Sequence, residues 1–261
     1  MSCPFRIFNI MIKLTSLLLE IVTKPKAIFI AGPAGSGKGY ISKQLLPSNF
    51  ITINSDDTYE ELLKASGIGL KQKDFTPDQL SQASKFQSQA RKDTQNKLEK
   101  SIKDKNNLII DSTGGSSNVV LKKKQELEDL GYECLMVMVY TSPITSLQRN
   151  IQRDRSLMPS IVLRSWRDVN TNIDVYKQAF GNNFILVNND PKDASKGFSQ
   201  ELIEPFFKDT KATGKPKTAE EEVKSKAERE KLMNDIKTLI NKIPKFDSLE
   251  SAKTKINNFI K

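Results

Sequence analysis

The sequence predicts an α/β fold, a doubly wound and mainly parallel sheet of five strands. Short runs that are apolar on both faces alternate with helical stretches, as a buried parallel sheet requires. The first run also leads straight into a glycine-rich turn and a helical stretch, which is typical of a phosphate-binding strand, loop and helix. The expected strands are 27–31, 50–53, 108–111, 134–140 and 184–187.

Residues 1–24 are expected to form an N-terminal docking helix or extension. Apolar residues recur there at helical spacing, namely Leu14, Leu17, Leu18 and Ile21. Lys13 and Glu20 interrupt the apolar run and leave it too short to span a bilayer, so we expect no membrane association. Met11 offers a second start, with residues 1–10 as an extension.

Residues 26–39 carry the first strand into a turn with the spacing Gly-x-x-x-x-Gly-Lys. Its glycines let consecutive backbone N–H groups point inward as an anion nest, and Lys38 supplies a cation for the β and γ phosphates. A helix that begins near Lys38 adds the positive end of its dipole. We expect these residues to bind ATP: Gly32, Pro33, Ala34, Gly35, Ser36, Gly37, Lys38, Gly39 and Tyr40.

Position 39 is glycine, where a P-loop usually has a Ser or Thr that holds Mg²⁺ directly. The ending Gly37-Lys38-Gly39 resembles the loop of adenylate kinase and other nucleoside monophosphate kinases, in which water completes the metal shell. The missing hydroxyl therefore favours a kinase over a GTPase or a motor.

Two carboxylates follow strands at the edge where ligands of such sheets gather. Asp111 closes an apolar run, and we expect it to position the water shell of Mg²⁺; the alternative is a cap for the next helix. Asp56 is expected to accept the proton of an attacking hydroxyl, the alternative again being a helix cap. Asp57 could exchange roles with Asp56, and the sequence does not separate them.

The fourth strand is followed by Thr141-Ser142-Pro143, a strong helix start. That helix carries Arg149 and Arg153 four residues apart, hence on one face. We expect a lid whose guanidinium groups neutralise charge on a transferred phosphoryl group. The alternative is a solvated basic face.

Residues 26–190 resemble the zeta toxin and related P-loop kinases. The resemblance rests on the glycine loop, on Ile53-Asn54-Ser55-Asp56, on Ile110-Asp111-Ser112-Thr113 and on the helix with Arg149 and Arg153. It implies a fold of the P-loop kinase type over 25–190 and transfer of the γ-phosphate of ATP to a hydroxyl, with the Asp56 position as base and the lid arginines on the phosphates.

The sequence departs from this family in two places. Gly39 replaces the metal-binding hydroxyl, and Tyr59 stands where many relatives carry an arginine. In zeta toxins proper the acceptor is a sugar of UDP-N-acetylglucosamine, and the change at Tyr59 puts that substrate in doubt. Such kinases build their acceptor site in the insertion 58–105, of which 77–103 is expected to be one polar helix.

The amino-acid composition excludes several kinds of catalytic and metal site. The 261 residues contain no histidine, which excludes His-based acid–base catalysis and His-ligated metals. The two cysteines are far apart and suggest no disulfide framework, so a reducing, cytoplasmic location is expected. The formal charge of +10 suits nucleic acid or anionic metabolites. Because the lysines are dispersed, we favour metabolites.

Composition changes after residue 190. Residues 191–222 are expected to be a linker, since 208–222 lack apolar anchors. Residues 223–261 are expected to form an amphipathic helical hairpin that docks on the core, on a second copy or on a partner protein. Its two apolar stripes are Leu232, Ile236, Leu239, Ile240 and Ile243, then Leu249, Ala252, Ile256 and Phe259.

These observations predict a kinase that uses ATP and Mg²⁺ to phosphorylate a hydroxyl or phosphate of a small molecule, such as a nucleotide or nucleotide sugar. The alternative is a P-loop regulator or polynucleotide-binding protein that uses ATP as a conformational ligand. The glycine at position 39 leaves that alternative open. No sequence signal identifies the acceptor, a toxin–antitoxin role or the assembly state.

Overall fold

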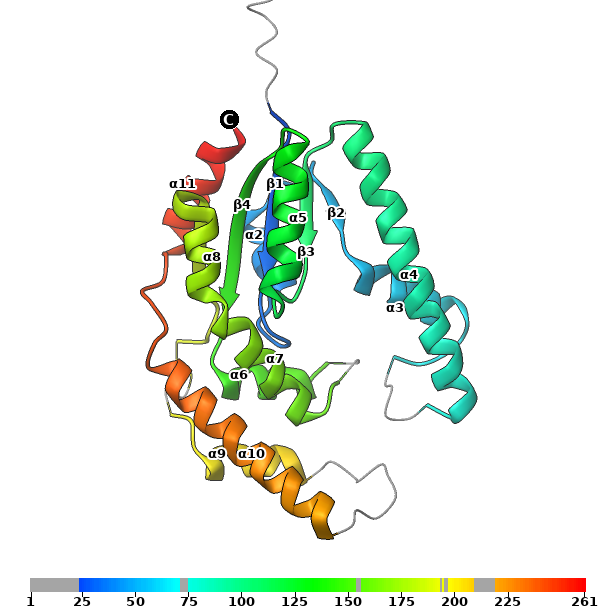
Figure 1. The fold of residues 1–261 in the computed structure, drawn as a ribbon, viewed down its shortest axis with the longest axis vertical. Helices are drawn as coiled ribbons and strands as arrows, with labels where there is room; N and C mark the ends of the chain where they lie inside the picture. The colour runs from blue at the N-terminus through cyan, green and yellow to red at the C-terminus, as the bar shows by residue number, and fades with distance from the viewer. Residues whose placement is uncertain (1–23, 71–74, 154–155, 193, 195–196, 209–218) are drawn as a thin grey trace, which may run out of the picture.

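The computed structural model describes residues 24–70, 75–153, 156–192, 194, 197–208 and 219–261. A five-stranded sheet in the order β2-β3-β1-β4-β5, with every neighbouring pair parallel, forms its centre (Figure 1). The strands are β1 (Lys26–Ala31), β2 (Ile51–Ile53), β3 (Leu108–Asp111), β4 (Glu133–Tyr140) and β5 (Phe184–Asn188). Each lies within one residue of its predicted bounds, so the predicted fold class is confirmed.

Strand β1 occupies the middle of the sheet and is paired on both sides. Its residues 27–31 are at most 1% exposed. The register aligns Ile30 with Asp111 on β3 and with Val137 on β4. The loop that follows β1 therefore leaves the sheet at the centre of its carboxyl edge, beside Asp111.

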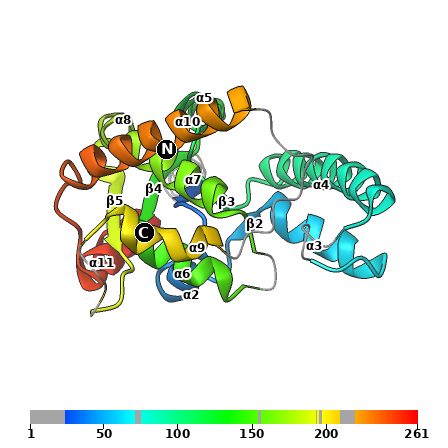
Figure 2. The same cartoon turned by 90° about the horizontal axis from the view of Figure 1, so that it is seen from below.

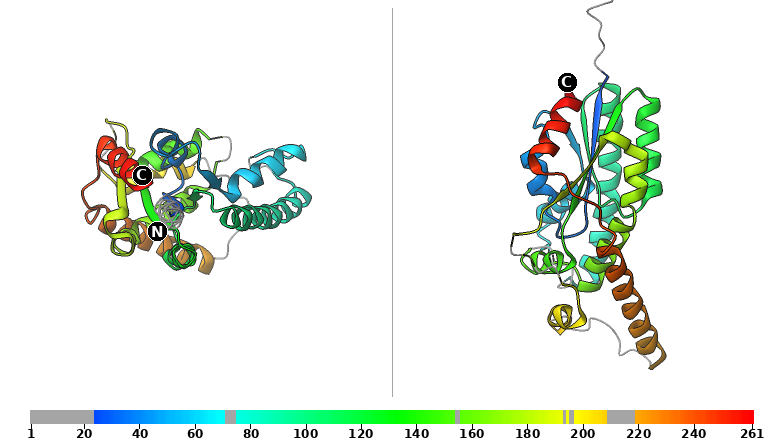
Figure 3. Two further views of the ribbon diagram at one scale, coloured as in Figure 1. Left: turned by 90° about the horizontal axis from the view of Figure 1, so that it is seen from above. Right: turned by 90° about the vertical axis from the view of Figure 1, so that its left-hand side faces the viewer.

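Helices cover both faces of the sheet (Figure 3). On one face, α2 (Lys38–Leu45) and α11 (Leu249–Ile260) pack against Ile28 and Ile30 of β1. On the other face, Phe29 belongs to a larger core that is shared with several helices and includes the fully buried Trp166. These helices include α5 (Ser117–Asp129), α7 (Pro159–Thr171), α8 (Ile173–Phe180) and α10 (Ala219–Ile240). A short 3-10 helix, η2 (Gly181–Asn183), leads into β5.

Helices α3 (Ser55–Ala65) and α4 (Pro77–Lys103) project to one side of the sheet (Figure 2). They share a small core of their own, made of Tyr59, Leu63, Ile68, Ala83 and Ala90. Thr76 caps α4 with a capping box and Pro77 fills the first turn, which confirms the predicted polar helix over 77–103. This α3–α4 arm stands beside the carboxyl edge of the sheet.

Helix α6 (Pro143–Ile151) begins where β4 ends, and α7 follows it beneath the carboxyl edge (Figure 1). The Ser142 side chain accepts a hydrogen bond from the amide of Thr145 at 3.3 Å, the predicted cap. The indole N–H of Trp166 on α7 donates to the carbonyl of Thr141 at 2.7 Å. This buried bond ties α7 to the end of β4.

The C-terminal helices correct one prediction. Both stripes form helices, but α10 packs against α7 beyond the carboxyl edge of the sheet, whereas α11 packs against α2 and β5 on one face, so the two do not pair as a hairpin (Figure 3). Between them the chain crosses the edge of β5, where the amide of Asp247 donates to the carbonyl of Leu186 at 2.7 Å. Each stripe packs into a core cluster that includes strands of the sheet. Ile236 and Ile256 are accordingly fully buried.

The region predicted as a linker, 191–222, contains one helix that the sequence did not indicate. This is α9 (Gln200–Lys208), whose Ile203 is fully buried in the larger core. The predicted docking helix lies in residues 1–23, outside the described residues. Among the described residues, no helix combines the length and apolarity needed to cross a bilayer.

We expect Ile236→Ala and Ile256→Ala each to lower the free energy of unfolding by about 3 kcal/mol, because each leaves a cavity under a docked helix. Since the two residues belong to cores on opposite faces, the double variant should show the sum of the two losses. Leu249→Ala, at a side chain that is 45% exposed on α11, is the control. Denaturant unfolding measures all four; a hairpin would instead give strongly non-additive losses.

Candidate active site

The glycine loop after β1 requires glycine at three positions. Gly35 and Gly37 have φ of 80° and 79°, a left-handed conformation that disfavours side chains. A Cβ at Gly35 would also lie 2.5 Å from the carbonyl oxygen of Ser146. A Cβ at Gly32 would lie 2.6 Å from the carbonyl oxygen of Val139. The loop can therefore pack tightly against β4 and α6 only with this sequence.

Two neighbouring elements hold the start of the loop. The amide of Gly32 donates to the carbonyl of Thr113 after β3 at 3.1 Å. The amide of Ala34 donates to the hydroxyl of Ser165 on α7 at 3.3 Å. Inside the loop, the hydroxyl of Ser36 is buried and has no hydrogen-bond partner among the described residues. A buried polar atom of this kind fits a loop built to surround a polar ligand.

Helix α2 presents its N-terminus at the end of the loop. Gly37 occupies the cap position and no side chain caps the helix. The first backbone N–H groups of a helix have no partner within it, so this end attracts anions. Lys38 folds back across the loop, and its ammonium group donates to the carbonyl of Gly32 at 3.1 Å. The loop and Lys38 together form a cationic cradle that suits an anion.

Three of the other predicted site residues lie near Lys38. Burial lowers the pKa of its ammonium group, while the charges of Asp111 and Asp56 act in the opposite direction. The nearby charge of Arg153 lowers that pKa further. The structure thus brings the loop lysine together with both predicted carboxylates and one predicted lid arginine.

Asp111 is a partly buried carboxylate with an unusual titration. Burial raises its pKa to about 6, although the Lys38 charge opposes the rise. Its Oδ2 accepts a hydrogen bond from Asn54 Nδ2 at 3.2 Å. Asn54 Oδ1 in turn accepts from the amide of Asp56 at 2.9 Å, which caps α3. Asn54 therefore links the two predicted carboxylate positions.

The helix caps also exclude the alternatives for these carboxylates. The cap of α3 is Asn54, not Asp56, and the residue before α5 is Ser116, not Asp111. The charge of Asp56 raises the pKa of Lys38, and the charges of both Asp57 and Asp56 raise the pKa of Asp111. Desolvation and the neighbouring Glu60 raise the pKa of the Asp57 carboxyl. Both carboxylates therefore lie near the charged groups of the loop.

Arg149 is placed differently from Arg153. Its guanidinium group donates to the carbonyls of Gly35 and Ser36 at 3.4 and 3.3 Å, and to that of Asn189 at 2.7 Å. All three acceptors are backbone carbonyls. Arg149 therefore binds the backbone of the loop, while Arg153 lies near Lys38.

The residues at the loop fit a magnesium ion held mainly through water. Among the described residues, no group of three or more His, Cys, Asp and Glu side chains has the arrangement of a metal site. Asp111 is the carboxylate next to Lys38. A Cβ at Gly39 would meet no atom within 4 Å, so there is open space where other P-loops place a hydroxyl.

Sequence reasoning missed Asn189 and Ser165. Asn189 donates from its side chain to the carbonyl of Ser36 at 2.7 Å. It belongs to the polar run 188–190 directly after the fifth strand, the same signal that identified Asp56 and Asp111. Ser165 lies within α7 and has no such signal.

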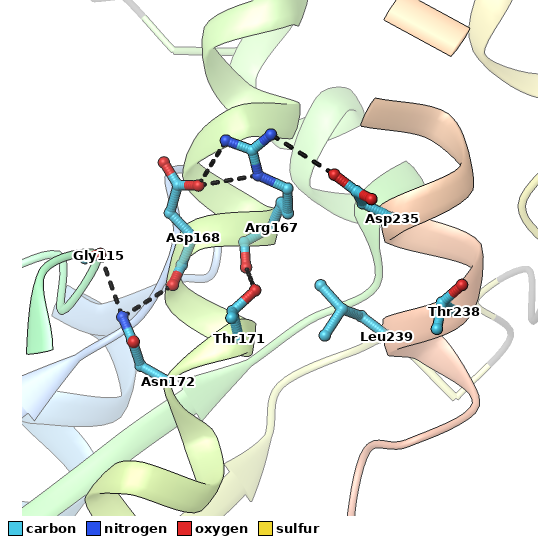
Figure 4. Close-up of a pocket in the computed structure, with 8 residues that line it drawn as sticks. All are labelled: Gly115, Arg167, Asp168, Thr171, Asn172, Asp235, Thr238 and Leu239. Carbon is cyan, nitrogen blue, oxygen red and sulfur yellow. Dashed lines mark hydrogen bonds and ion pairs between the residues drawn. The ribbon is translucent and has the colours of Figure 1, made fainter. Parts of the chain in front are cut away.

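A pocket of about 520 Å³ lies between α7 and α10 (Figure 4). Arg167 of α7 pairs there with Asp168 at 2.7 Å and with Asp235 of α10 at 3.8 Å. Asn172 donates to the carbonyl of Gly115 at 3.1 Å. These polar groups bind one another, and none of the predicted site residues lines the pocket, so it belongs to the attachment of α10.

The family model of the zeta toxin matches residues 15–190, more than half of the chain. Among curated proteins no relative matches the chain. The match covers the sheet, the glycine loop and both predicted carboxylates.

Solved structures with a similar arrangement include the following two. One comes from the PezAT chromosomal toxin–antitoxin system of Streptococcus pneumoniae, at 18% identity over 90% of this chain and 97% of that one, with a TM-score of 0.48. The other is AvrRxo1-ORF1:-ORF2 crystallised with ATP, at 15% identity over 91% of this chain and 80% of that one, with a TM-score of 0.48.

We expect Asp111→Asn to stabilise the chain in a pH-dependent way. Because the pKa of Asp111 is raised from 3.8 to about 6, the unfolded chain loses this proton first as the pH rises. Stability is therefore lost between these two values, and asparagine removes that loss. The variant should be more stable than the native chain by about 1–3 kcal/mol at pH 7.5 and nearly equal to it at pH 4. Denaturant unfolding across this range measures the difference, and a pH-independent difference would contradict the expectation.

Proposed function

The chain belongs to the zeta toxin family, and from that membership we propose that it is an ATP-dependent phosphotransferase. It moves the γ-phosphate of ATP to a hydroxyl or phosphate of a small molecule, such as a nucleotide or a nucleotide sugar. The observation that carries this proposal is the buried ammonium group of Lys38, set in a glycine loop and flanked by Asp111, Asp56 and Arg153. Charged groups with perturbed pKa values cluster at functional sites, which supports this proposal.

Each residue then has a role in in-line phosphoryl transfer. The loop amides and Lys38 bind the β and γ phosphates, and Arg153 neutralises charge on the transferred group. Asp56 orients or deprotonates the acceptor hydroxyl. Asp111 holds the water shell of Mg²⁺, which when bound screens the phosphate oxygens.

The acceptor would lie between the α3–α4 arm and the helices α6 and α7. Tyr59, at the position where many relatives carry an arginine, is 2% exposed and belongs to the core of the arm. Its side chain thus packs inside the arm instead of offering a cation at the surface. This supports an acceptor other than the nucleotide sugar of the zeta toxins proper.

We expect Lys38→Ala to lower phosphate transfer on the order of 10³-fold with little change in stability, because it removes the cation of the cradle. Lys43→Ala, at an exposed lysine of the same helix, is the matched control and should retain activity. Transfer of labelled γ-phosphate to pooled nucleotides, nucleotide sugars and 5′-hydroxyl oligonucleotides measures it.

Undiminished transfer by the Lys38→Ala variant would overturn the assignment. A native chain that binds ATP but transfers no phosphate to any pool would favour the regulator or polynucleotide-binding alternative. Salt-dependent binding of DNA would then distinguish those two.

We expect Gly39→Thr to lower the Mg²⁺ concentration needed for half-maximal activity. The position has open space for a side chain, and the added hydroxyl would hold the ion directly. Gly39→Ala adds the carbon without the hydroxyl and should leave the magnesium requirement unchanged. Magnesium titration of the transfer reaction compares the three chains, and equal behaviour of the threonine and alanine variants would contradict a hydroxyl effect.

A further inference from the structure

We propose that Arg149 and Asn189 form a clamp that orients the Ser36–Gly37 peptide, and with it the N–H of Gly37 that the phosphate site uses. The inference rests on the proposed function, because it assigns a positioning role within the same phosphate site. It also changes the role of Arg149 from contact with phosphate to support of the loop.

The two residues of the clamp meet at one carbonyl. Asn189 Nδ2 donates to the oxygen of Ser36 at 2.7 Å, and Arg149 Nη1 donates to the same oxygen at 3.3 Å. Arg149 also donates to the carbonyl of Gly35 at 3.4 Å. Its Nη2 reaches the carbonyl of Asn189 at 2.7 Å, so Arg149 holds Asn189 while both hold the loop.

Peptide geometry converts these contacts into an orientation of the amide. A trans peptide is planar, so the C=O of Ser36 and the N–H of Gly37 point in opposite directions. Two donors on the Ser36 oxygen therefore direct the Gly37 N–H away from the clamp. Gly37 has the left-handed φ of 79°, and the place of its missing Cβ is filled by the Asn189 side chain. Glycine at position 37 therefore leaves the space that the Asn189 side chain occupies.

Rigid elements carry both residues. The amide of Asn189 donates to the carbonyl of Tyr140 at 2.9 Å, which extends the pairing of β5 with β4. The next residue, Asp190, accepts from the hydroxyl of Thr141 at 2.7 Å and from the amide of Ser142 at 2.8 Å. The end of β5 is thereby fixed to the start of α6, which carries Arg149. A clamp on such elements can hold a peptide in one orientation.

The position of Arg149 argues against direct contact with phosphate. A guanidinium group has five N–H donors and no acceptor. Here both of its terminal nitrogens donate to backbone carbonyls, which the positive charge suits. Arg153, not Arg149, acts on the charge of Lys38. The arginine pair of α6 and the turn after it is therefore divided between support and charge neutralisation.

The test compares ADP with AMP, which lacks the β-phosphate that the nest would hold. We expect Asn189→Ala to weaken ADP binding about tenfold, the effect of one lost hydrogen bond to a site that must stay ordered, and to leave AMP binding unchanged. Asn189→Asp should weaken ADP binding more, because a carboxylate repels the Ser36 carbonyl. Arg149→Lys should also weaken ADP binding, since an ammonium group cannot hold the three carbonyls that the guanidinium group binds. Calorimetry on the full chain gives both affinities.

Asn182→Ala is the matched control, since Asn182 is an exposed asparagine of η2 at the opposite end of β5 and should retain native ADP affinity. Equal losses of ADP and AMP affinity in the Asn189 and Arg149 variants would overturn the clamp, because they indicate contact with the base or a general loss of structure. Unchanged ADP affinity in the Asn189→Ala variant would also overturn it.

Hydrogen exchange on the ligand-free chain tests the clamp without any nucleotide. Asn189→Ala should accelerate exchange in peptides that cover 32–41 and leave peptides from β4 and β5 unchanged. If residues 32–41 of the variant exchange at the same rate as in the native chain, the clamp is refuted, whether or not the chain binds a nucleotide. Conversely, a native chain that binds no ADP but shows the accelerated exchange would refute the proposed function alone.

Discussion

The directions of a few peptide groups in the glycine loop govern the rest of this site. A backbone can bind phosphate only if successive N–H groups point to one side, and planarity then sends the linked carbonyls to the other side. Those carbonyls need partners, since they lie between β4, α6 and the end of β5. Glycine at Gly32, Gly35 and Gly37 allows the turn, and the surrounding elements complete it.

Charge forms a second constraint, which depends on the first. Burial of the Lys38 ammonium group is costly, and the loop permits it because Asp111 and Asp56 lie within range. Burial likewise destabilises the charged form of the Asp111 carboxyl and raises its pKa to about 6. Neither charge is fully balanced by the protein alone. Binding of a polyanion together with its counter-ion would balance both charges. The proposed kinase activity rests on this binding.

The features predicted from the sequence are those set by residues close together in the chain. All five strands, the glycine loop and the helix 77–103 follow from local patterns, as do Asp56 and Asp111 at strand ends. What it missed depends on segments far apart in the chain. Asn189 lies 153 residues from Ser36, and only the folded sheet brings them together. The predicted hairpin failed for the same reason, since local stripes of apolar residues do not say which surface will cover them.

The segment after residue 190 is joined to the site through α7. This helix contacts the loop through Ser165, and its C-cap residue Asn172 donates to the carbonyls of Gly114 and Gly115 after β3. On its other side α7 packs against α10, whose Asp235 reaches Arg167. A helix that borders the phosphate site is thus held between that site and the C-terminal region. Residues beyond the family match therefore pack on the same helix that contacts the loop.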